Sequence, residues 1–534
     1  MAVNRRLTTA GAVAGSLVGL WSLLSIPGAE PPVAPAPERG RAFAWNQDAL
    51  WRSLETTYVK ARVAGCGTAD RAAAEGLRGL AATAERLRRV SVSSDAVALD
   101  SLEARFFALA PLVAACPRHL RDYARLSGRL REAIKWQSRG WHVASAGARA
   151  RLYRSLYGFR GAVEEAMLQH PDSGFSLLEG RREPSATPAA SVHGVEIRSG
   201  DILVSRGGYP TSALIARGND YPGNFSHVGL VHVDSISHTA SVIEAHIERG
   251  VAVSTADGYL RDKKLRIMVL RLRADLPALI ADPLLPHRAA SRALERARSG
   301  HIAYDFDMDY TDASRLFCSE VASSVYGELG VRLWTGLSTI SAPGLRRWLS
   351  AFGVRHFETQ EPSDLEYDPQ LVVVAEWRDA GALMQDHIDN AVIDAMLEGA
   401  EAGDPLSYPW YELPLARLAK AYSWLLGGLG GQGPVPQGMS ARAALRNSAF
   451  STATLGRGPR GRGGGPIHPA AGVPASILGS PRPVPDRYRG VARGASDRAP
   501  LGYDYSVRSL EPCPKVRSGS WPRWPRRTRP RPRR

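Results

Sequence analysis

The hydrophobic pattern changes its period near residue 193. In residues 43–169, apolar side chains recur at the spacing of an amphipathic helix. In residues 195–377, they occur in short β-type runs, such as 226–233 and 265–272. Strand runs with helices segregated from them favour an α+β domain around an antiparallel sheet. The pattern therefore predicts four or five antiparallel helices followed by this α+β domain.

Composition divides the chain further. The last 104 residues contain 15 Gly and 16 Pro, a share that cannot support a packed core, so we expect them to be disordered. The predicted units are a signal peptide or membrane anchor with a Pro-rich spacer (1–42), the helical bundle (43–170), a polar linker (171–192), the α+β domain (193–380), two helices that pack on it (381–427) and a disordered basic tail (428–534).

The net charge of +16 lies in the tail. Residues 431–534 hold 20 Lys and Arg against 4 Asp and Glu, which leaves 48 basic and 48 acidic residues in the rest of the chain. A nucleic-acid-binding protein needs a basic surface on the folded domain itself. We therefore expect no nucleic-acid partner, whereas the Arg/Pro-rich end offers a contact for anionic lipid or cell-wall polymer.

The N-terminus predicts export. Arg5 and Arg6 precede an apolar stretch that runs to about Pro27, and a Pro/Ala-rich spacer follows. This order is typical of a secretory signal or of an uncleaved anchor. The expected location is the bacterial periplasm, or the membrane with the protein facing the periplasm, and the sequence leaves cleavage of the signal open.

Cys318 is the candidate nucleophile. A cysteine hydrolase needs a thiolate, a base beside it, a group that orients the base, and donors for an oxyanion. The pattern places Cys318 at the start of a helix that runs to about Leu329, where the helix dipole lowers a thiol pKa. A free cysteine alone is more often a small buried apolar residue, so the prediction depends on a partner.

His227 is the candidate base, because it opens an expected strand at an end of the sheet. Antiparallel pairing with the next strand places either Glu244 and His246 or Ala245 and Ile247 on its face. A carboxylate flanked by apolar residues requires a partner. Glu244 is therefore predicted to orient His227. His246 is the alternative for this role, and if Glu244 fills it, His246 is expected to line the cleft.

Five short motifs carry a family resemblance. In order they are GDILV from Gly200, SHVGLV from Ser226, VIEA from Val242, YDF from Tyr304 and FCSEV from Phe317. The series resembles the permuted papain-like cysteine hydrolases of the NlpC superfamily, in their YiiX/YaeF-like branch. The resemblance covers about residues 195–380 and implies a permuted papain-like fold for this α+β domain.

The resemblance also implies roles for single residues. Cys318 would be the nucleophile, His227 the general base and Glu244 the third, orienting member of a triad. Tyr304 and Asp305 would line the cleft beside the cysteine helix. The histidines near His227 lack the tight spacing of metal ligands, so neither a metal nor a cofactor is expected.

These inferences predict an exported cysteine amidase or peptidase that cleaves an amide or ester bond through an acyl-enzyme. The expected substrate is a peptidoglycan peptide or an N-acylated lipid. One alternative is acyl transfer between lipids on the same Cys/His pair. Another is a non-catalytic, envelope-binding scaffold protein in which the helical bundle carries the function.

A disulfide is predicted between Cys66 and Cys116. If the first helix ends near Cys66 and the next two run over about 68–89 and 98–115, both cysteines emerge at the same end of the bundle. A bridge requires a Cα separation of about 4.4–6.8 Å. An oxidising compartment would preserve the bond. Two buried thiols at helix ends are the alternative.

Overall fold

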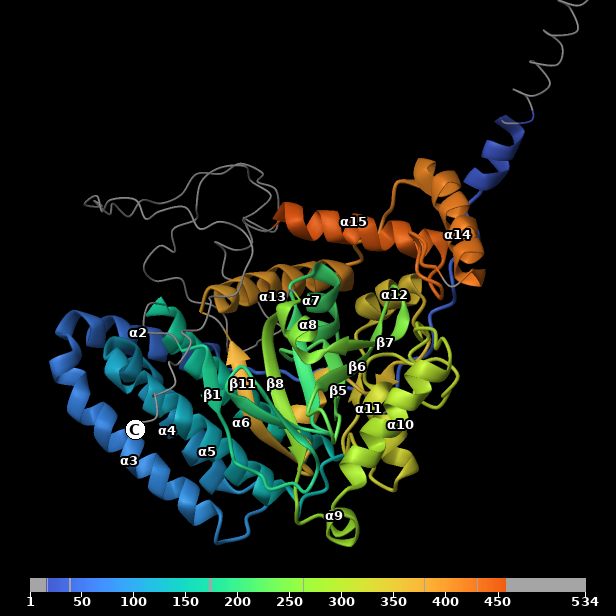
Figure 1. The fold of residues 1–534 in the computed structure, drawn as a ribbon. Helices are drawn as coiled ribbons and strands as arrows, with labels where there is room; N and C mark the ends of the chain where they lie inside the picture. The colour runs from blue at the N-terminus through green and yellow to red at the C-terminus, as the bar shows by residue number, and fades with distance from the viewer. Residues whose placement is uncertain are drawn as a thin grey trace, which may run out of the picture.

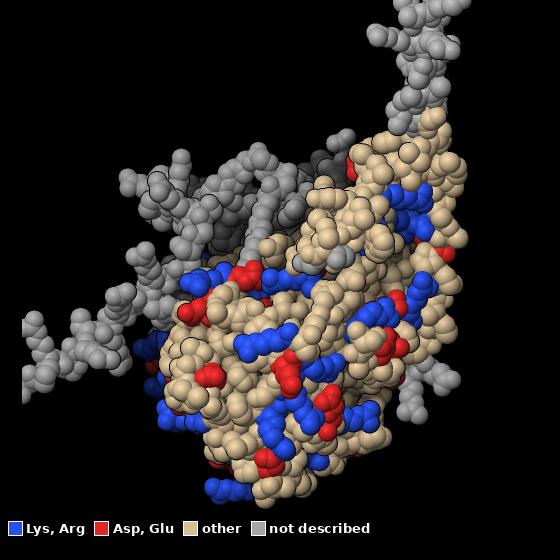
Figure 2. Space-filling model, turned by 45° about the vertical axis from the view of Figure 1, so that its right-hand side comes forward, with Lys and Arg blue, Asp and Glu red and all other residues tan. Residues whose placement is uncertain are grey.

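The computed structural model describes residues 16, 18–37, 40–171, 175–262, 264–378, 380–429 and 431–457. A helical bundle lies beside an antiparallel sheet, and further helices cover the far side and one end of that sheet (Figure 1). The predicted α+β architecture is thus confirmed. Basic and acidic side chains are interspersed over the lower part of the face in Figure 2, whereas its upper right is mainly uncharged.

The bundle contains five long helices around an aromatic core. Phe106 stacks on Tyr123 with ring centroids 4.5 Å apart, and Phe159 lies 4.4 Å from Phe106. The last helix lies between the bundle and the sheet and is buried on most of its surface. The helices are α2 (Asp48–Ala64), α3 (Cys66–Leu87), α4 (Val97–Ala115), α5 (Leu120–Ser138) and α6 (Ala146–Leu168).

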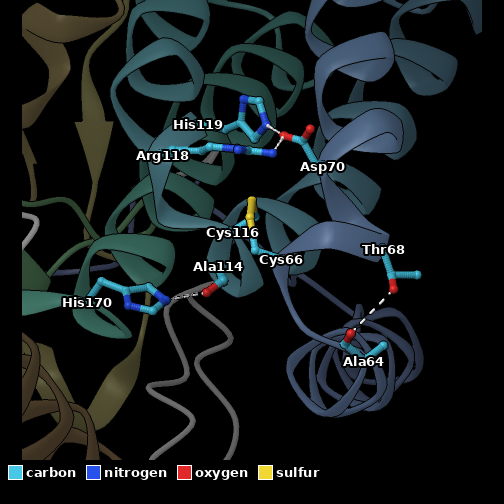
Figure 3. The surroundings of a disulfide bond; sticks show 9 residues. All are labelled: Ala64, Cys66, Thr68, Asp70, Ala114, Cys116, Arg118, His119 and His170. Carbon is cyan, nitrogen blue, oxygen red and sulfur yellow. Dashed lines mark hydrogen bonds and ion pairs between the residues drawn. A yellow bond between two sulfur atoms is a disulfide. The ribbon is translucent and has the colours of Figure 1, made fainter.

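A disulfide closes one end of the bundle. Cys66 begins α3 and Cys116 follows α4, and their Cα atoms are 4.6 Å apart across the bond. Beside it, Asp70 of α3 accepts a hydrogen bond from His119 at 2.7 Å and pairs with Arg118 (Figure 3). The start of α3 is therefore held to the junction of α4 and α5 by a covalent bond and by charge.

The main sheet has seven strands, and all of its paired neighbours are antiparallel. Their order is β1 (Leu177–Glu179), β11 (Leu371–Arg378), β8 (Lys264–Leu272), β4 (Ile202–Gly207), β5 (His227–Val233), β6 (Ala240–His246) and β7 (Gly250–Thr255). Two small ladders accompany it, β2 (Ala189–Val192) with β3 (Val195–Arg198) and β9 (Ser338–Thr339) with β10 (Glu358–Thr359).

Alternation along β5 divides the domain core between two faces. Val228 and Leu230 lie in the cluster that α10 (Leu285–Ser299) and α11 (Glu320–Glu328) cover. Val231 and Val233 lie in the opposite cluster, which α8 (Ala256–Arg261) and the β2/β3 ladder cover. Both faces of this strand are buried, which explains its nearly continuous apolar sequence.

The segment 171–192 is more than the predicted polar linker. It supplies β1, an edge strand of the main sheet, and β2 of a small ladder. The apolar pair Leu177 and Leu178 explains the difference, because Leu178 is buried where β1 pairs with β11. The linker thus carries the chain from the bundle directly onto the sheet.

Three helices follow the sheet. They are α13 (Ala380–Glu401), α14 (Leu413–Gly428) and α15 (Ala441–Arg457). The helix α15 packs against α7 (Pro210–Arg217) and α12 (Pro343–Phe352) as well as α14.

The prediction of a disordered tail from residue 428 is wrong at its start, because α15 lies within that segment and buries Ala443 and Phe450. An average over a Gly/Pro-rich segment concealed a stretch rich in Ala at helical spacing. Residues 458–534, with most of the basic tail, lie outside the described residues.

The bundle disulfide generates a stability prediction. In the chain-entropy treatment, closing a loop of about 50 residues stabilises the folded state by at most about 4 kcal/mol. Replacing both cysteines (Cys66→Ala with Cys116→Ala) should therefore lower the free energy of unfolding, measured by urea titration. Cys318→Ser serves as the control for loss of a thiol outside the bridge. Non-reducing mass spectrometry that recovers Cys66 and Cys116 in separate, alkylated peptides would contradict the bond.

Candidate active site

The register of β5 and β6 brings His227 and Glu244 together. Gly229 pairs with Glu244, so Glu244 and His246 are the β6 residues on the side of the sheet that His227 occupies. His227 Nε2 lies 2.7 Å from Glu244 Oε2. The structure therefore selects the first of the two face assignments that the sequence left open.

Glu244 is a buried carboxylate with several donors. Its Oε1 accepts a hydrogen bond from Ser254 Oγ at 3.0 Å and lies 3.2 Å from His246 Nε2. Burial raises the pKa of Glu244, but the hydrogen bonds of His227 and His246 outweigh burial and hold that pKa well below its usual value. Glu244 is thus ionised at neutral pH, and His246 bonds to the same carboxylate rather than replacing it.

The His227 ring lies nearly parallel to the ring of Tyr259 in α8, with centroids 6.5 Å apart. Burial lowers the pKa of His227, and the hydrogen bond to Glu244 opposes this effect without reversing it. The imidazole is therefore neutral at pH 7. Because Glu244 occupies Nε2, Nδ1 is the nitrogen that remains for exchange of a proton.

Cys318 lies in the turn before α11 and is 4% exposed. It is the free cysteine of the described residues. Burial raises the pKa of its thiol to about 12, although the backbone N–H of Val228 directs a hydrogen bond at the sulfur and lowers it. That contact places the thiol beside the residue that follows His227.

The predicted lowering of the thiol pKa is therefore wrong. The helix begins at Glu320, two residues after Cys318, so the cysteine is not within the first helical turn. The desolvation of a thiolate at this buried position exceeds the stabilisation from the backbone donor. Burial raises the pKa of Tyr259 most, followed by the charge of Glu244, and a charge on Cys318 would add to it, so Tyr259 lies near both groups.

Glu320 closes the cysteine turn. Its Oε2 accepts a hydrogen bond from the backbone N–H of Phe317 at 2.8 Å, across Cys318. Burial, together with nearby acidic groups such as Asp305, raises the pKa of Glu320 to about 8. Glu320 is thus a buried carboxyl group that shapes the turn.

Tyr304 and Asp305 lie beside this turn. The backbone N–H of Leu316 donates to Ala303 O at 3.1 Å, which aligns the two segments. Burial and then the Cys318 charge raise the pKa of Tyr304. The Asp305 carboxylate accepts the backbone N–H groups of Asp307 and Asp309 and so folds the following loop.

An apolar pocket adjoins these residues. Its volume is about 110 Å³. Burial is the largest cause of the raised pKa of Cys318, and the charge of Glu361, in the wall of the pocket, raises it further. The lining residues are Thr211, Leu214, Ile215, Gly218, Ile247, Tyr304, Asp305, Phe306, Met308, Ile340, Leu349, Phe352, Val354, Glu361, Met439 and Asn447. Sequence reasoning missed most of them, because they come from many separate segments, α7, α12 and α15 among them, and share no motif.

A set of potential metal ligands lies elsewhere, at Cys66, Asp70 and Cys116. The two sulfur atoms are bonded to each other, and Asp70 binds Arg118 and His119. These atoms are therefore engaged in the structural link of the bundle rather than free to coordinate an ion.

A comparison with protein families identifies the domain that carries this geometry. The family described as permuted papain-like amidase enzyme, YaeF/YiiX, C92 family, matches residues 196–375. These residues include His227, Glu244 and Cys318. Comparisons with curated proteins and with solved structures give no significant match. Over residues 196–375, the chain is thus similar to the permuted papain-like amidases of the YaeF/YiiX family.

Proposed function

We propose that the protein is a cysteine hydrolase that cleaves an amide or ester bond through an acyl-enzyme. Cys318 is its nucleophile, His227 its base and Glu244 the group that orients the base. The observation that supports this assignment best is the 2.7 Å contact between His227 and the buried carboxylate of Glu244, next to the turn that carries the only free thiol of the described chain.

In the proposed reaction, the thiol and the imidazole are both neutral before substrate binds. As the Cys318 sulfur attacks the carbonyl carbon, its proton passes to His227 Nδ1. Glu244 stabilises the resulting imidazolium through Nε2, and the backbone N–H of Cys318 helps to bind the oxyanion. The imidazolium then protonates the leaving amine or alcohol. Water hydrolyses the thioester, giving its proton to His227, and the thiol is restored.

The apolar pocket favours an acylated lipid over a peptidoglycan peptide as substrate. Most of its wall is aliphatic or aromatic, including Leu214, Ile215 and Phe352. A peptide with several charged groups would leave them without partners there, at a large desolvation cost. An aliphatic chain loses nothing on entering such a wall. We therefore propose that the acyl part of the substrate is apolar and occupies this pocket.

Transfer of the acyl group to a second lipid uses the same thioester and differs in the acceptor that replaces water.

Export to the periplasm remains part of the proposal. It is supported by the N-terminal sequence and by the Cys66–Cys116 disulfide, since structural disulfides persist in oxidising compartments.

The triad generates the first activity prediction. With a p-nitrophenyl acyl ester, Cys318→Ser and His227→Ala should each lower kcat/KM at least about a hundredfold, because the two groups act as a unit. Glu244→Gln should be milder, since the base remains but its tautomer is less well held. Mass spectrometry should detect an acyl adduct on Cys318 in the unaltered protein.

The matched control is His232→Ala, at the other end of the same strand. It should leave the rate within about twofold. If Glu244→Gln is silent and His246→Ala is not, His246 is the third member. If these variants keep the wild-type rate and no adduct forms, Cys318 and His227 are not the catalytic pair. If the unaltered protein shows no activity, the non-catalytic scaffold replaces the enzyme.

The pKa directions predict the pH dependence. Because the pKa of His227 lies below 6.5 and that of Cys318 is about 12, both groups have the reactive neutral form from about pH 6.5 upward. The kcat/KM profile should rise with one ionisation below pH 6.5 and stay flat to about pH 9. Glu244→Gln removes the hydrogen bond that raises the His227 pKa, so its rising limb should move to lower pH. A rate that rises only above pH 8 would show that free thiolate formation limits the reaction.

Filling the pocket should change the preference for chain length. Ile215→Phe adds volume to the wall, so kcat/KM for a long-chain acyl ester should fall about tenfold relative to an acetyl ester. Ile215→Val, which adds no volume, is the control and should not favour the short chain. An equal loss with both esters would place the acyl chain elsewhere.

A further inference from the structure

The helix α14 and the residues at its two ends present an apolar stripe to solvent. Its members recur at intervals of three or four residues along one side of the helix and are 51–85% exposed: Tyr411, Leu415, Leu418, Tyr422, Leu425 and Leu429. Trp410 and Trp424 extend the exposed surface and are 64% and 75% exposed. The surface of a soluble protein rarely exposes a contiguous apolar patch of this kind unless the patch binds a partner.

A second apolar segment lies against the same helix. Arg417 of α14 donates to the backbone carbonyl oxygens of Leu24 and Ile26, at 2.8 and 2.9 Å. Residues 18–25 are helical and expose further apolar side chains, Leu20 and Leu23 among them. This segment is the later part of the apolar stretch that the sequence marks as a signal or anchor, whose beginning lies outside the described residues. In the part of the chain that the structure describes, no helix meets the length and hydropathy of a bilayer span.

The charges beside the stripe are mostly positive. Between residues 410 and 446 the chain has four basic residues and one acid, Glu412. Arg417 and Lys420 donate to backbone carbonyl oxygens, whereas Arg442 and Arg446 share the carboxylate of Glu30. Figure 2 shows this end as mainly uncharged, with a basic cluster beside it. A helix with Trp and Leu on one side and Lys and Arg nearby has the composition of an interfacial membrane helix.

The stripe lies at the end of the sheet that carries the candidate active site. Ser205, near the end of β4, pairs with His227. The helix α7 follows β4, α15 packs on α7, and α14 packs on α15 (Figure 1). Met439, which lies between α14 and α15, and Asn447 of α15 both line the apolar pocket. The pocket and the stripe are therefore joined through α15.

We propose that α14 and residues 18–26 form a docking face that lies in the interface of an anionic lipid bilayer. The aromatic residues Trp410, Tyr411, Tyr422 and Trp424 match the preference of Trp and Tyr for the headgroup level. The stripe lacks charged groups that would fix the register of a protein partner, and continuity with the N-terminal apolar segment points to lipid. The proposal does not depend on the cleavage chemistry.

A fluorescent label at one stripe position tests insertion separately from the N-terminal segment. In the full chain with Cys318→Ser and Cys513→Ser, Leu425→Cys is labelled with NBD and mixed with vesicles of phosphatidylglycerol and phosphatidylcholine. The emission should rise at least about twofold, and brominated lipid should quench it. The matched control is Ile236→Cys, which should not respond. Ile236 is 89% exposed and lies in the turn between β5 and β6, at the opposite end of β5 from His227.

The alternatives give distinct results. An unchanged emission at position 425 in anionic vesicles would overturn the proposal, even if the chain binds through its N-terminus. An equal response at position 236 would overturn it as well. Light scattering without lipid tests a second copy as the occupant: a dimer that Leu418→Ser with Leu425→Ser dissociates would replace the bilayer. Thermal melting confirms that each variant is folded.

Discussion

Charges buried between α6, the sheet and α13 fix how the parts of the molecule sit together. Arg266 of β8 lies 2.6 Å from Glu164 of α6 and 2.6 Å from Asp386 of α13, and all three are almost fully buried. Arg160 of α6 lies 2.5 Å from Glu376 of β11. Removing one partner of such a pair leaves an uncompensated charge at a cost of about 3–5 kcal/mol. These ion pairs therefore hold the bundle, the sheet and α13 in fixed relative positions. The bundle is a structural part of the hydrolase domain, although the family match does not include it.

The candidate site depends on this arrangement through α13. Asp394 of that helix lies 2.9 Å from Arg217 at the end of α7, and Arg217 also donates to Tyr157 of α6 at 2.9 Å. The helix α7 supplies three residues of the pocket wall, and α15, which packs on α7, supplies Asn447. The residues of the proposed triad lie on the sheet and its adjoining turn, whereas part of the proposed substrate pocket is built by helices that the buried charges hold in position.

Motif order and local pattern predicted the parts of the structure that local sequence determines. The bundle and the antiparallel sheet follow from periodicity. Alternation along paired strands left two face assignments open beside His227, and the apolar neighbours of Glu244 favoured the assignment that the structure shows. The raised pKa of Cys318 does not follow from local pattern, because burial depends on the whole fold and α11 starts two residues later than expected. The helix over 441–457 was missed because composition was averaged over a Gly/Pro-rich segment. Buried charges such as Glu164 look like a solvated helix face in sequence, since nothing local shows that α6 lies between two layers.

The pocket and the α14 stripe are connected through α15, and this placement affects the free energy of bringing an acylated lipid from a bilayer to the pocket. Moving an acyl chain from a bilayer into water costs about 0.8 kcal/mol for each exposed methylene group. A hydrolase whose pocket opened away from the membrane would meet this cost for every carbon of the chain. In this protein, Met439 and Asn447 of the pocket wall lie just before and within α15, the helix that packs on α14. An acyl chain that passed from a bilayer under α14 into that wall would avoid this cost, so the proposed docking face and the proposed acyl pocket meet one requirement for reaching Cys318.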